Sequence, residues 1–505
     1  MGKHSSMDRK EYMVMVSDSP VDTGDNPAGD EFAGVGLVTR RQYKLHRLAV
    51  ADPGHRFDDL FNLVAHPMFL YEAWVRVANN HGARSAGSDG VTVHQIEAEI
   101  GTWKYLEQIR VMLKQGQYRP QPVKERLIPK PGSTKKRRLG IPTVMDRIVQ
   151  ASLKLVLEPI FEAGFSPASY GFRPNRRAHD AIAEVHHFTT LGYQWVLEGD
   201  IEACFDRIDH TALMGRVRAR IKDKRVCALV KAFLKAGVLT ELGDMEDTHT
   251  GTPQGGILSP LLANIALTVL DEAFTADWQT NQPMSTTQRR ATRRRKGLGN
   301  WRIVRYADDF VVMCDTNQNQ CEQARKIAAM VLQPMGLALS PSKTLVTHVK
   351  DGFDFLGFHI QWKPKRGSNK GYVYTFPSQR AIRAVKQKTY ELTRRTSQAD
   401  LETTLIRLNQ ILKGWANYFR HGASYKTFHH IQSYVWHRIV SWQMKLHKWN
   451  WYDIRRWLTN PNGTWKPISA GNTILYNPER IGITRYRYRG NQIPRPFHPP
   501  EPKPA

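Results

Sequence analysis

Two adjacent carboxylates between two apolar, β-branched runs constrain the fold of this chain more than any other feature. Asp308 and Asp309 follow the run at residues 303–306 and are continued by the run at 310–313, so the pattern predicts a β-hairpin with both acids at its turn. Neighbouring ionised carboxylates repel each other, and a proton or a cation must offset their charge. A divalent cation does this most simply, although two aspartates in a surface turn are also common.

A third carboxylate ends another predicted strand upstream. Residues 195–197 form a short apolar run, and Asp200 follows it closely. Two-metal phosphoryl transfer needs oxygen ligands that hold Mg²⁺ ions about 3.5–4 Å apart, so that one ion activates the attacking hydroxyl and the other steadies the leaving group. Asp200 together with the pair Asp308 and Asp309 supplies such ligands, and we predict a site for phosphoryl transfer.

The segments around these acids predict an α+β fold. The short strands alternate with helical runs at residues 146–161 and 259–274. Apolar residues at helical spacing also occur upstream, at 61–78 and 95–113, while residues 401–457 predict two or three amphipathic helices. A chain of 505 residues is long enough for about three domains.

Basic side chains dominate the charge, which indicates a polyanionic partner. The chain has 73 Lys and Arg against 46 Asp and Glu, a net charge of +27. Cations gather in the run 289–296 and alternate with tyrosines at 485–489, as in proteins that bind nucleic-acid backbones. A solvated surface is the alternative for any charge run. The residues expected to contact RNA or DNA are Arg289, Arg290, Arg293, Arg294, Arg295, Lys413, Arg485, Arg487 and Arg489.

Neither a disulfide framework, a zinc site nor a membrane span is predicted. The four cysteines form no CxxC pair, and no apolar run reaches the roughly 18 residues that a membrane helix needs. We therefore expect a soluble protein of a reducing compartment.

The motifs around the acids resemble those of reverse transcriptases, in the order that this family uses. YADD at residues 306–309 is similar to the family's YxDD box. The similar stretches together cover about residues 80–360. They include RLIPKPGSTKKRRLGIP at 126–142, SYGFRPNR at 169–176, GTPQGGILSPLLAN at 251–264, LSPSKT at 339–344 and FLGF at 355–358.

The roles that the resemblance implies for the acids agree with their chemistry. Asp200, Asp308 and Asp309 would be the catalytic residues, and the main-chain carbonyl of Ile201 would join them as a metal ligand. The expected cofactor is a pair of Mg²⁺ ions, for which Mn²⁺ can substitute. Carboxylate and carbonyl oxygens are the ligands that such hard cations prefer.

Further residues are expected around the incoming deoxynucleoside triphosphate (dNTP). Phe205 resembles the steric gate that excludes a ribose 2′-hydroxyl, with an ordinary core phenylalanine as the alternative. Tyr306 and Gly357 resemble residues that contact primer and template. Cations would hold the triphosphate, and glycine would allow close approach of the backbone. The other residues expected to bind the nucleotide are Lys130, Arg137, Arg138, Gln254, Gly255 and Lys343.

Other motifs narrow the resemblance to reverse transcriptases encoded by group II introns. LNQILKGWANYF at residues 408–419 is similar to their thumb and maturase domain, and SDGV at 88–91 resembles their extra N-terminal block. Many such proteins end in a zinc-associated HNH endonuclease. No cysteine follows Cys321, so we expect no HNH domain in this chain.

The resemblance implies an RNA-dependent DNA polymerase with maturase activity, which assists intron splicing and copies RNA into DNA during retrohoming. The implied partners are group II intron RNA, target DNA, a template–primer duplex and dNTPs. The implied location is a ribonucleoprotein of the bacterial cytoplasm, while an organelle and a homodimer stay open. The implied fold is an α+β right-hand polymerase, whose fingers and palm contain an antiparallel sheet, followed by an α-helical thumb/maturase domain.

Changes in composition and the motifs together set the expected domain boundaries. The first 50 or so residues are rich in Asp, Gly, Ser and Pro without periodicity, as is typical of a tail. The expected domains are a flexible N-terminal tail (1–55), a helical N-terminal extension of the fingers (56–120), the fingers and palm (121–375), the helical thumb/maturase domain (376–460) and a basic nucleic-acid-binding tail (461–505).

Other functions stay open from the sequence alone. One is a domesticated reverse transcriptase in phage defence or CRISPR spacer acquisition, and another is an RNA-binding splicing scaffold without a need for polymerisation. The complete set of Asp200, Asp308, Asp309 and Gln254 argues against a pure scaffold, because RNA binding does not require it. An RNA-templated RNA polymerase is disfavoured by the bulk of Phe205.

Overall fold

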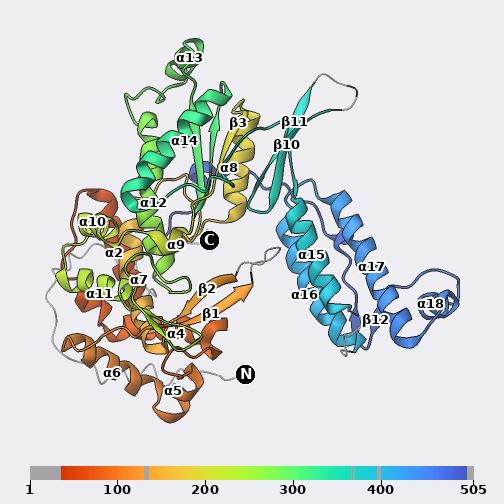
Figure 1. Ribbon diagram of the computed structural model, residues 1–505, viewed down its shortest axis with the longest axis horizontal. Helices are drawn as coiled ribbons and strands as arrows, with labels where there is room; N and C mark the ends of the chain where they lie inside the picture. Colours follow the sequence, from red (N-terminus) through yellow and green to blue (C-terminus); the bar gives the residue numbers. More distant parts are fainter. Residues whose placement is uncertain (1–35, 130–135, 366, 368–369, 395–399, 498–505) are drawn as a thin grey trace, which may run out of the picture.

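The computed structural model has the order of elements of a right-hand polymerase (Figure 1). Helices and a small sheet form the fingers, an antiparallel sheet covered by helices forms the palm, and a helical bundle beside the palm forms the thumb. The expected α+β class is therefore confirmed. The structure describes residues 36–129, 136–365, 367, 370–394 and 400–497.

Six helices form the base of the fingers, and both helical runs predicted there are split in two. Pro67 begins the second helix of the first pair, because a proline at the first helical position leaves no N–H unpaired. Gly101 separates the second pair with a φ of 83°, a left-handed value that favours glycine. The helices are α2 (Leu37–Ala51), α3 (Phe61–Val64), α4 (Pro67–Ala78), α5 (Val93–Glu99), α6 (Thr102–Lys114) and α7 (Val144–Glu162), with a 3-10 turn at His81–Arg84.

Helix α2 lies where the sequence predicts a flexible tail (residues 1–55), and that prediction is wrong over this helix. α2 packs on α7, which contains Pro159. Since a proline has no N–H, the carbonyl of Leu155 four residues earlier loses its helical partner. The side chain of Gln42 donates to that carbonyl at 2.8 Å, and Nδ1 of His46 lies 3.0 Å from the carbonyl oxygen of Pro159. The proline thus creates the polar contacts that dock α2.

A four-stranded sheet in the order β2-β1-β4-β5 completes the fingers. Strands β1 and β2 are antiparallel, and their hairpin projects on the side of the fingers that faces the thumb (Figure 1). Strand β4 runs parallel to β1 and antiparallel to β5. The strands are β1 (Val123–Pro129), β2 (Lys136–Ile141), β4 (Val238–Leu239) and β5 (Met245–Glu246).

The palm is a four-stranded antiparallel sheet in the order β6-β7-β3-β8. The three strands predicted from the sequence are confirmed, as are the helical runs that became α7 and α12. The strands are β3 (Trp195–Gly199), β6 (Trp301–Tyr306), β7 (Asp309–Cys314) and β8 (Leu345–His348). The helices are α8 (Ala178–Thr190), α9 (Cys204–Arg207), α10 (His210–Arg220), α11 (Lys224–Leu234), α12 (Ser259–Thr275), α13 (Thr287–Arg295) and α14 (Gln318–Leu332).

Both faces of the palm sheet are buried, which explains why β7 is apolar from Phe310 to Cys314. Phe310 and Val312 of β7 face the core that α12 and α14 cover, while Val311 and Met313 face a core shared with α8. Successive residues of a strand point to opposite faces, so a strand that is apolar throughout fits a sheet covered on both sides. The β6–β7 hairpin is therefore held from two directions.

A three-stranded sheet in the order β11-β10-β9 connects the palm to the thumb. The sequence predicted two or three amphipathic helices over residues 401–457, and the structure has three, each of which contributes buried residues to one core. Within the described residues, no helix is long and apolar enough to span a membrane. The elements are β9 (Phe353–Phe355), β10 (Phe358–Pro364), β11 (Gly371–Pro377), α15 (Gln379–Leu392), α16 (Leu401–Phe419), α17 (Tyr425–His447) and α18 (Trp451–Leu458).

The segment after α18 returns along the thumb to the palm. A small hairpin of β12 (Ser469–Ala470) and β13 (Thr473–Ile474) lies on α16, where Asn409 donates to the carbonyl of Ile474 at 2.8 Å. Further on, Nε and Nη2 of Arg489 each donate to Asp180 of α8 at 2.8 Å. This part of the expected basic tail is therefore packed against both thumb and palm.

Candidate active site

The register of the palm sheet brings two of the predicted catalytic acids opposite each other. Gly199 at the end of β3 pairs with Phe310 of β7, so the next residues along each antiparallel strand are Asp200 and Asp309. A Cβ at residue 199 would lie 2.2 Å from the ring of Phe310, so this close packing requires glycine. Asp200 and Asp309 therefore meet at one end of the sheet.

Asp308 joins them through a two-residue turn. Tyr306 pairs with Asp309 across the β6–β7 hairpin, which leaves only Ala307 and Asp308 between the strands. Ala307 has a φ of 56°, in the left-handed region that non-glycine residues disfavour. The turn places Asp308 and Asp309 side by side, beside the end of β3.

The three acids influence each other electrostatically. Burial raises the pKa of Asp308, and the nearby charge of Asp200 raises it further, while Arg137 and Lys343 act in the opposite direction. Burial followed by the charges of Asp308 and Asp200 raises the pKa of Asp309 to about 6. A cation between the carboxylates would relieve this repulsion.

Lys343 lies directly against one of the acids. Its Nζ is 3.0 Å and 3.2 Å from the two carboxylate oxygens of Asp200. The segment that carries Lys343 is fixed to the end of β3, because the amide of Ser340 donates to the carbonyl of Asp200 at 2.8 Å. Ile201, the other predicted ligand, forms an isolated bridge with Leu339 of the same segment.

The oxygen-rich end of the sheet fits Mg²⁺. Within the described residues, no three His, Cys, Asp or Glu side chains form a ready-made metal cage. Mg²⁺ does not need one, because it keeps several waters and takes one or two carboxylates together with the phosphates of a substrate. Asp200, Asp308 and Asp309 offer only oxygen donors, whose mutual repulsion a divalent cation would remove.

Arg137 and Arg138 lie on opposite sides of β2, because neighbouring side chains of a strand alternate. Arg137 is close enough to Asp308 to lower its pKa. Arg138 instead forms ion pairs with Glu125 of β1 and Glu246 of β5. Arg138 therefore ties the fingers strands together in this structure, and its contact with the triphosphate stays a prediction.

One predicted nucleotide contact, Lys130, lies outside the described residues.

Gln254 and Gly255 lie in a loop that joins the fingers to the palm. The amide of Gly140 in β2 donates to the carbonyl of Gln254 at 2.7 Å, and a Cβ at residue 255 would lie 2.6 Å from the Gly140 oxygen. The amide of Thr252 donates to the carbonyl of Phe205 at 2.6 Å. Phe205 is half-buried, with its side chain against the core of fingers and palm. The loop is therefore fixed by main-chain hydrogen bonds to β2 on one side and to Phe205 on the other.

Gly357 and Tyr306 lie where the palm meets the thumb. Gly357 has a φ of 81° in the β9–β10 turn, and a Cβ there would be 3.6 Å from the ring of Phe419 at the end of α16. The hydroxyl of Tyr418 donates to the carbonyl of Leu356 in the same turn at 2.8 Å. The half-buried Tyr306 packs on the same core as Leu356. A duplex held between palm and thumb would pass both residues.

The arginines of α13 are remote from the acids, at the other end of β6 (Figure 1). Six strand residues separate them from the turn, or about 20 Å. Three of these arginines hold the helix against the palm: Arg290 lies 4.9 Å from the ring of Trp278, Arg293 5.8 Å from that of Trp301, and Arg294 3.1 Å from Asp315. Arg289 and Arg295 are exposed and contact only their own segment. The five are therefore not equally available to RNA.

The alternating Arg and Tyr residues of the C-terminal segment also divide into two sets. Arg485 and Arg487 are exposed. Tyr488 stacks on His187 of α8 with 4.5 Å between ring centroids, and Arg489 is paired with Asp180. Arg489 therefore holds this segment against α8, and its contact with nucleic acid stays a prediction. The remaining predicted contact, Lys413, is exposed on α16.

Two cations near the acids were not predicted. Arg380 in the first turn of α15 lowers the pKa of Asp309, and Arg305 is buried just before the catalytic turn. Nothing in the local sequence distinguishes Arg380 from the other basic residues of the thumb. Arg305 lies between the apolar residues Val304 and Tyr306 of a predicted strand. Because a buried cation is usually paired, this pattern could have predicted a buried ion pair.

Comparisons with known proteins agree with this geometry. Residues 128–360 match the family "Reverse transcriptase (RNA-dependent DNA polymerase)", and residues 382–460 match "Group II intron, maturase-specific domain". Protein YkfC of Escherichia coli (strain K12) is 36% identical over 68% of this chain and 94% of its own length.

Two relatives that introns encode are longer than the matching region. The group II intron-encoded protein LtrA of Lactococcus lactis subsp. cremoris is 33% identical over 60% of this chain, which covers 57% of LtrA. An uncharacterised 91 kDa protein in the cob intron of Schizosaccharomyces pombe is 29% identical over 71% of this chain and 50% of its own length. The chain thus spans about half the length of these two relatives. It belongs to the family of group II intron-type reverse transcriptases, in which an RNA-directed DNA polymerase domain is followed by a maturase domain.

Proposed function

We propose that this reverse transcriptase copies RNA into DNA at Asp200, Asp308 and Asp309, and that it assists splicing and retrohoming of a group II intron. The observation that carries the proposal is the meeting of three carboxylates at one end of the palm sheet, in a chain with a maturase domain. Family membership supports binding of intron RNA and of a template–primer duplex. The proposal also includes target DNA as a partner, dNTPs as substrates and a homodimer as the assembly.

The acids would hold divalent ions, which reverse transcriptases use. We propose two Mg²⁺ ions, replaceable by Mn²⁺, with Asp200, Asp308, Asp309 and the carbonyl of Ile201 as ligands. When bound, the ions would lower the pKa of the primer hydroxyl and stabilise charge on the leaving pyrophosphate. Lys343, which now contacts Asp200, would then be free to turn toward a phosphate.

The side chains around the acids would position the nucleotide. Arg137 faces the acids from the fingers, where a guanidinium can hold a phosphate in two-point contact. Gln254 lies on the loop fixed to β2, and Phe205 borders that loop. The half-buried ring of Phe205 would exclude a 2′-hydroxyl, which makes deoxynucleotides the preferred substrates.

Binding of structured RNA would use exposed cations away from the acids. Arg289 and Arg295 on α13, Lys413 on α16, and Arg485 with Arg487 are the exposed candidates. Contacts between such cations and phosphates would give an affinity that depends strongly on salt.

Two measurements on the full chain test the proposal. With Mg²⁺, dNTPs and a primed RNA template, we expect full-length complementary DNA, and little product when ribonucleotides replace dNTPs. RNA that co-purifies with the protein should be enriched in one group II intron sequence. Absence of RNA-templated DNA synthesis by folded protein would contradict the polymerase assignment, and co-purification of RNA without intron sequence would contradict the intron partner.

A further inference from the structure

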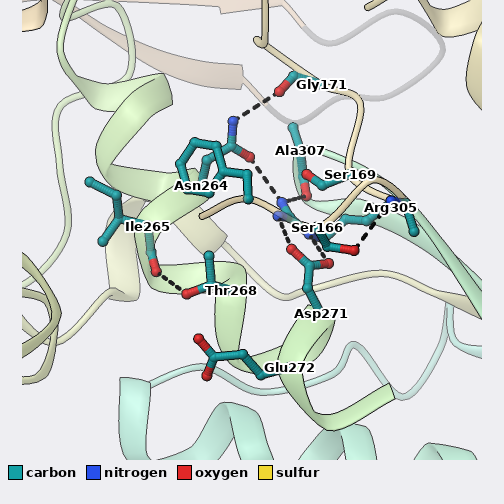
Figure 2. Close-up of polar contacts among 12 residues, drawn as sticks. Ser166, Ser169, Gly171, Asn264, Ile265, Thr268, Asp271, Glu272, Arg305 and Ala307 are labelled. Carbon is teal, nitrogen blue, oxygen red and sulfur yellow. Dashed lines mark hydrogen bonds and ion pairs between the residues drawn. The ribbon is translucent and has the colours of Figure 1, made fainter. Parts of the chain in front are cut away.

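Arg305, next to the catalytic turn, is buried completely, although its strand neighbours are apolar. Its Nε and Nη2 donate to the two carboxylate oxygens of Asp271 on α12, at 2.9 Å and 2.5 Å. Its Nη1 donates both to Oδ1 of Asn264 on α12 at 2.9 Å and to the carbonyl of Ala307 at 3.0 Å (Figure 2). One guanidinium therefore joins the palm helix to the main chain of the turn.

Asn264 extends this connection to a second segment. Its Oδ1 accepts from Arg305, and its Nδ2 donates to the carbonyl of Gly171 at 2.9 Å (Figure 2). These partners fix the orientation of the amide, since only its oxygen can accept and only its nitrogen can donate. A Cβ at residue 171 would lie 2.3 Å from the amide nitrogen of Ala307, so two stretches of backbone are in direct contact there.

The main chain of residue 305 is held by the same segment. Its amide donates to the carbonyl of Ala168 at 2.9 Å, and its carbonyl accepts from the amide of Tyr170 at 2.8 Å. The start of the catalytic turn is thus enclosed between α12 on one side and residues 168–171 on the other.

The contact with Ala307 bears directly on the acids. The carbonyl of Ala307 belongs to the peptide unit whose nitrogen is that of Asp308, so a hydrogen bond to it fixes the plane from which Asp308 projects. Ala307 has a left-handed φ of 56°, which is unfavourable for a non-glycine residue because its Cβ approaches the neighbouring carbonyl oxygen. Such a conformation persists only where its surroundings enforce it.

We propose that Arg305, oriented by Asp271 and Asn264, is a positioning residue for the polymerase reaction. It holds the Ala307 peptide in the one orientation that keeps the Asp308 and Asp309 carboxylates aimed at the divalent ions. This inference rests on the proposed function of the acids. A buried ion pair contributes little net stability compared with apolar packing. An apolar residue at position 305 would therefore stabilise the fold as well, so stability alone does not explain the guanidinium of Arg305.

The substitution Arg305→Lys separates positioning from charge. A lysine still provides a positive charge beside Asp271. Its single ammonium group cannot donate to Asp271, Asn264 and Ala307 at once, as the planar guanidinium of arginine does. The control is Arg173→Lys, because Arg173 is also buried, pairs with Glu162 at 2.7 Å, and donates to the carbonyls of Ser166 and Ser169 without a hydrogen bond to the turn itself. Both substitutions should lower the melting temperature to a similar degree.

The two variants should differ in what happens at the acids. Misplacement of a reacting group by about 1 Å can cost about 100-fold in rate, so we expect Arg305→Lys to lose between about 10-fold and 100-fold in single-turnover nucleotide incorporation. The KM for dNTP should change little. Mn²⁺ binding, measured by electron paramagnetic resonance on the complex with primer, template and a non-hydrolysable dNTP, should weaken in parallel. Arg173→Lys should leave both the rate and Mn²⁺ binding near those of the wild type.

Each result decides between the proposals. If the wild type does not incorporate dNTPs, the proposed function fails. If it does, and Arg305→Lys matches Arg173→Lys in rate and in Mn²⁺ binding, the positioning role is overturned while the function stands. Should Arg305→Lys melt below the assay temperature, Asn264→Ala carries the same test, because it keeps the Arg305–Asp271 pair and removes the hydrogen bonds of Asn264 with Arg305 and with the carbonyl of Gly171. A wild-type rate and Mn²⁺ affinity in that variant would overturn the role.

Discussion

At the scale of single residues, a position is predictable when strand periodicity and chemistry both specify it. Asp200, Asp308 and Asp309 follow apolar strands, so their meeting at one end of a sheet could be predicted from the sequence. Arg138 could not be placed from its motif alone, because the strand alternation turns it away from Arg137 and toward two glutamates. The partners of Arg305 are 34 and 41 residues away along the chain, so only the fold identifies them.

Phe205→Val tests the steric gate. A smaller side chain leaves room for the 2′-hydroxyl, so discrimination against ribonucleotides should fall by about tenfold or more. The measurement is the ratio of kcat/KM for a deoxynucleotide to that for its ribonucleotide. Phe161→Val in the same apolar core is the control, which should reduce stability without changing the ratio. An unchanged ratio in Phe205→Val would leave Phe205 as an ordinary core residue.

Glu184 on α8 makes stability depend on pH. Burial raises its pKa from 4.5 to about 7, and its carboxyl is hydrogen-bonded to the hydroxyl of Tyr170. Because the folded state then binds a proton more tightly than the unfolded state, this group destabilises the fold as pH rises from about 4.5 to about 7. Thermal melts of Glu184→Gln should show a flatter pH dependence over this range. A pH profile identical to that of the wild type would contradict the assignment.

At the scale of elements, long periodic segments were predictable, while their ends and their docking were not. The runs that became α7, α12 and the three thumb helices have strong apolar periodicity. Helix α2 docks through a carbonyl that Pro159 leaves without a helical partner in another helix. That kind of contact leaves no pattern within the helix itself.

The basic residues of α13, together with Lys296 after it, fall into two groups. Some of them contact the palm and support the fold, and the others are exposed to solvent. Replacing Arg289, Arg295 and Lys296 by glutamine should weaken RNA binding and lower its salt dependence by about one unit of slope for each lost phosphate contact. Melting should be unchanged, because these residues are exposed. In the matched triple variant, Arg290, Arg293 and Arg294 are replaced by glutamine. This variant should also have a lower melting temperature, because the substitutions break contacts with Trp278, Trp301 and Asp315. If the RNA affinity of the variant at Arg289, Arg295 and Lys296 has the same salt dependence as that of the wild type, these residues are exposed to solvent and do not bind RNA.

Nucleic-acid binding by the C-terminal segment is tested with point substitutions, because a truncation would also remove contacts that stabilise the fold. A chain that ends after about Leu475 would lose Tyr488 and Arg489 and would therefore also uncover α8. Arg485→Gln with Arg487→Gln should lower nucleic-acid affinity without a change in melting. Arg489→Gln should lower the melting temperature, because it leaves the buried carboxylate of Asp180 without its cation. Equal affinity of the double variant and the wild type would remove this segment from the interface.

At the scale of the whole molecule, the residues proposed for catalysis and those proposed for RNA binding lie in different places. One continuous apolar core joins the fingers to the palm, and a second joins the palm to β9–β11 and the end of α16. The acids lie at one end of the palm sheet, whereas α13 precedes the other end of β6 and Lys413 lies on α16 of the thumb. The loss of one metal-binding carboxylate should therefore leave the RNA-binding surfaces intact.

The measurement that tests this account most directly is RNA-templated primer extension by Asp200→Asn and Asp308→Asn, paired with filter binding of the same RNA. Each substitution removes a charge that metal binding needs without altering the basic surfaces, so extension should fall to background while RNA affinity stays within about twofold of the wild type. Asp351→Asn, an exposed carboxylate after the far end of β8, is the control and should behave as the wild type in both assays. Extension at near wild-type rate by either active-site variant, with Mg²⁺ present, would contradict the account.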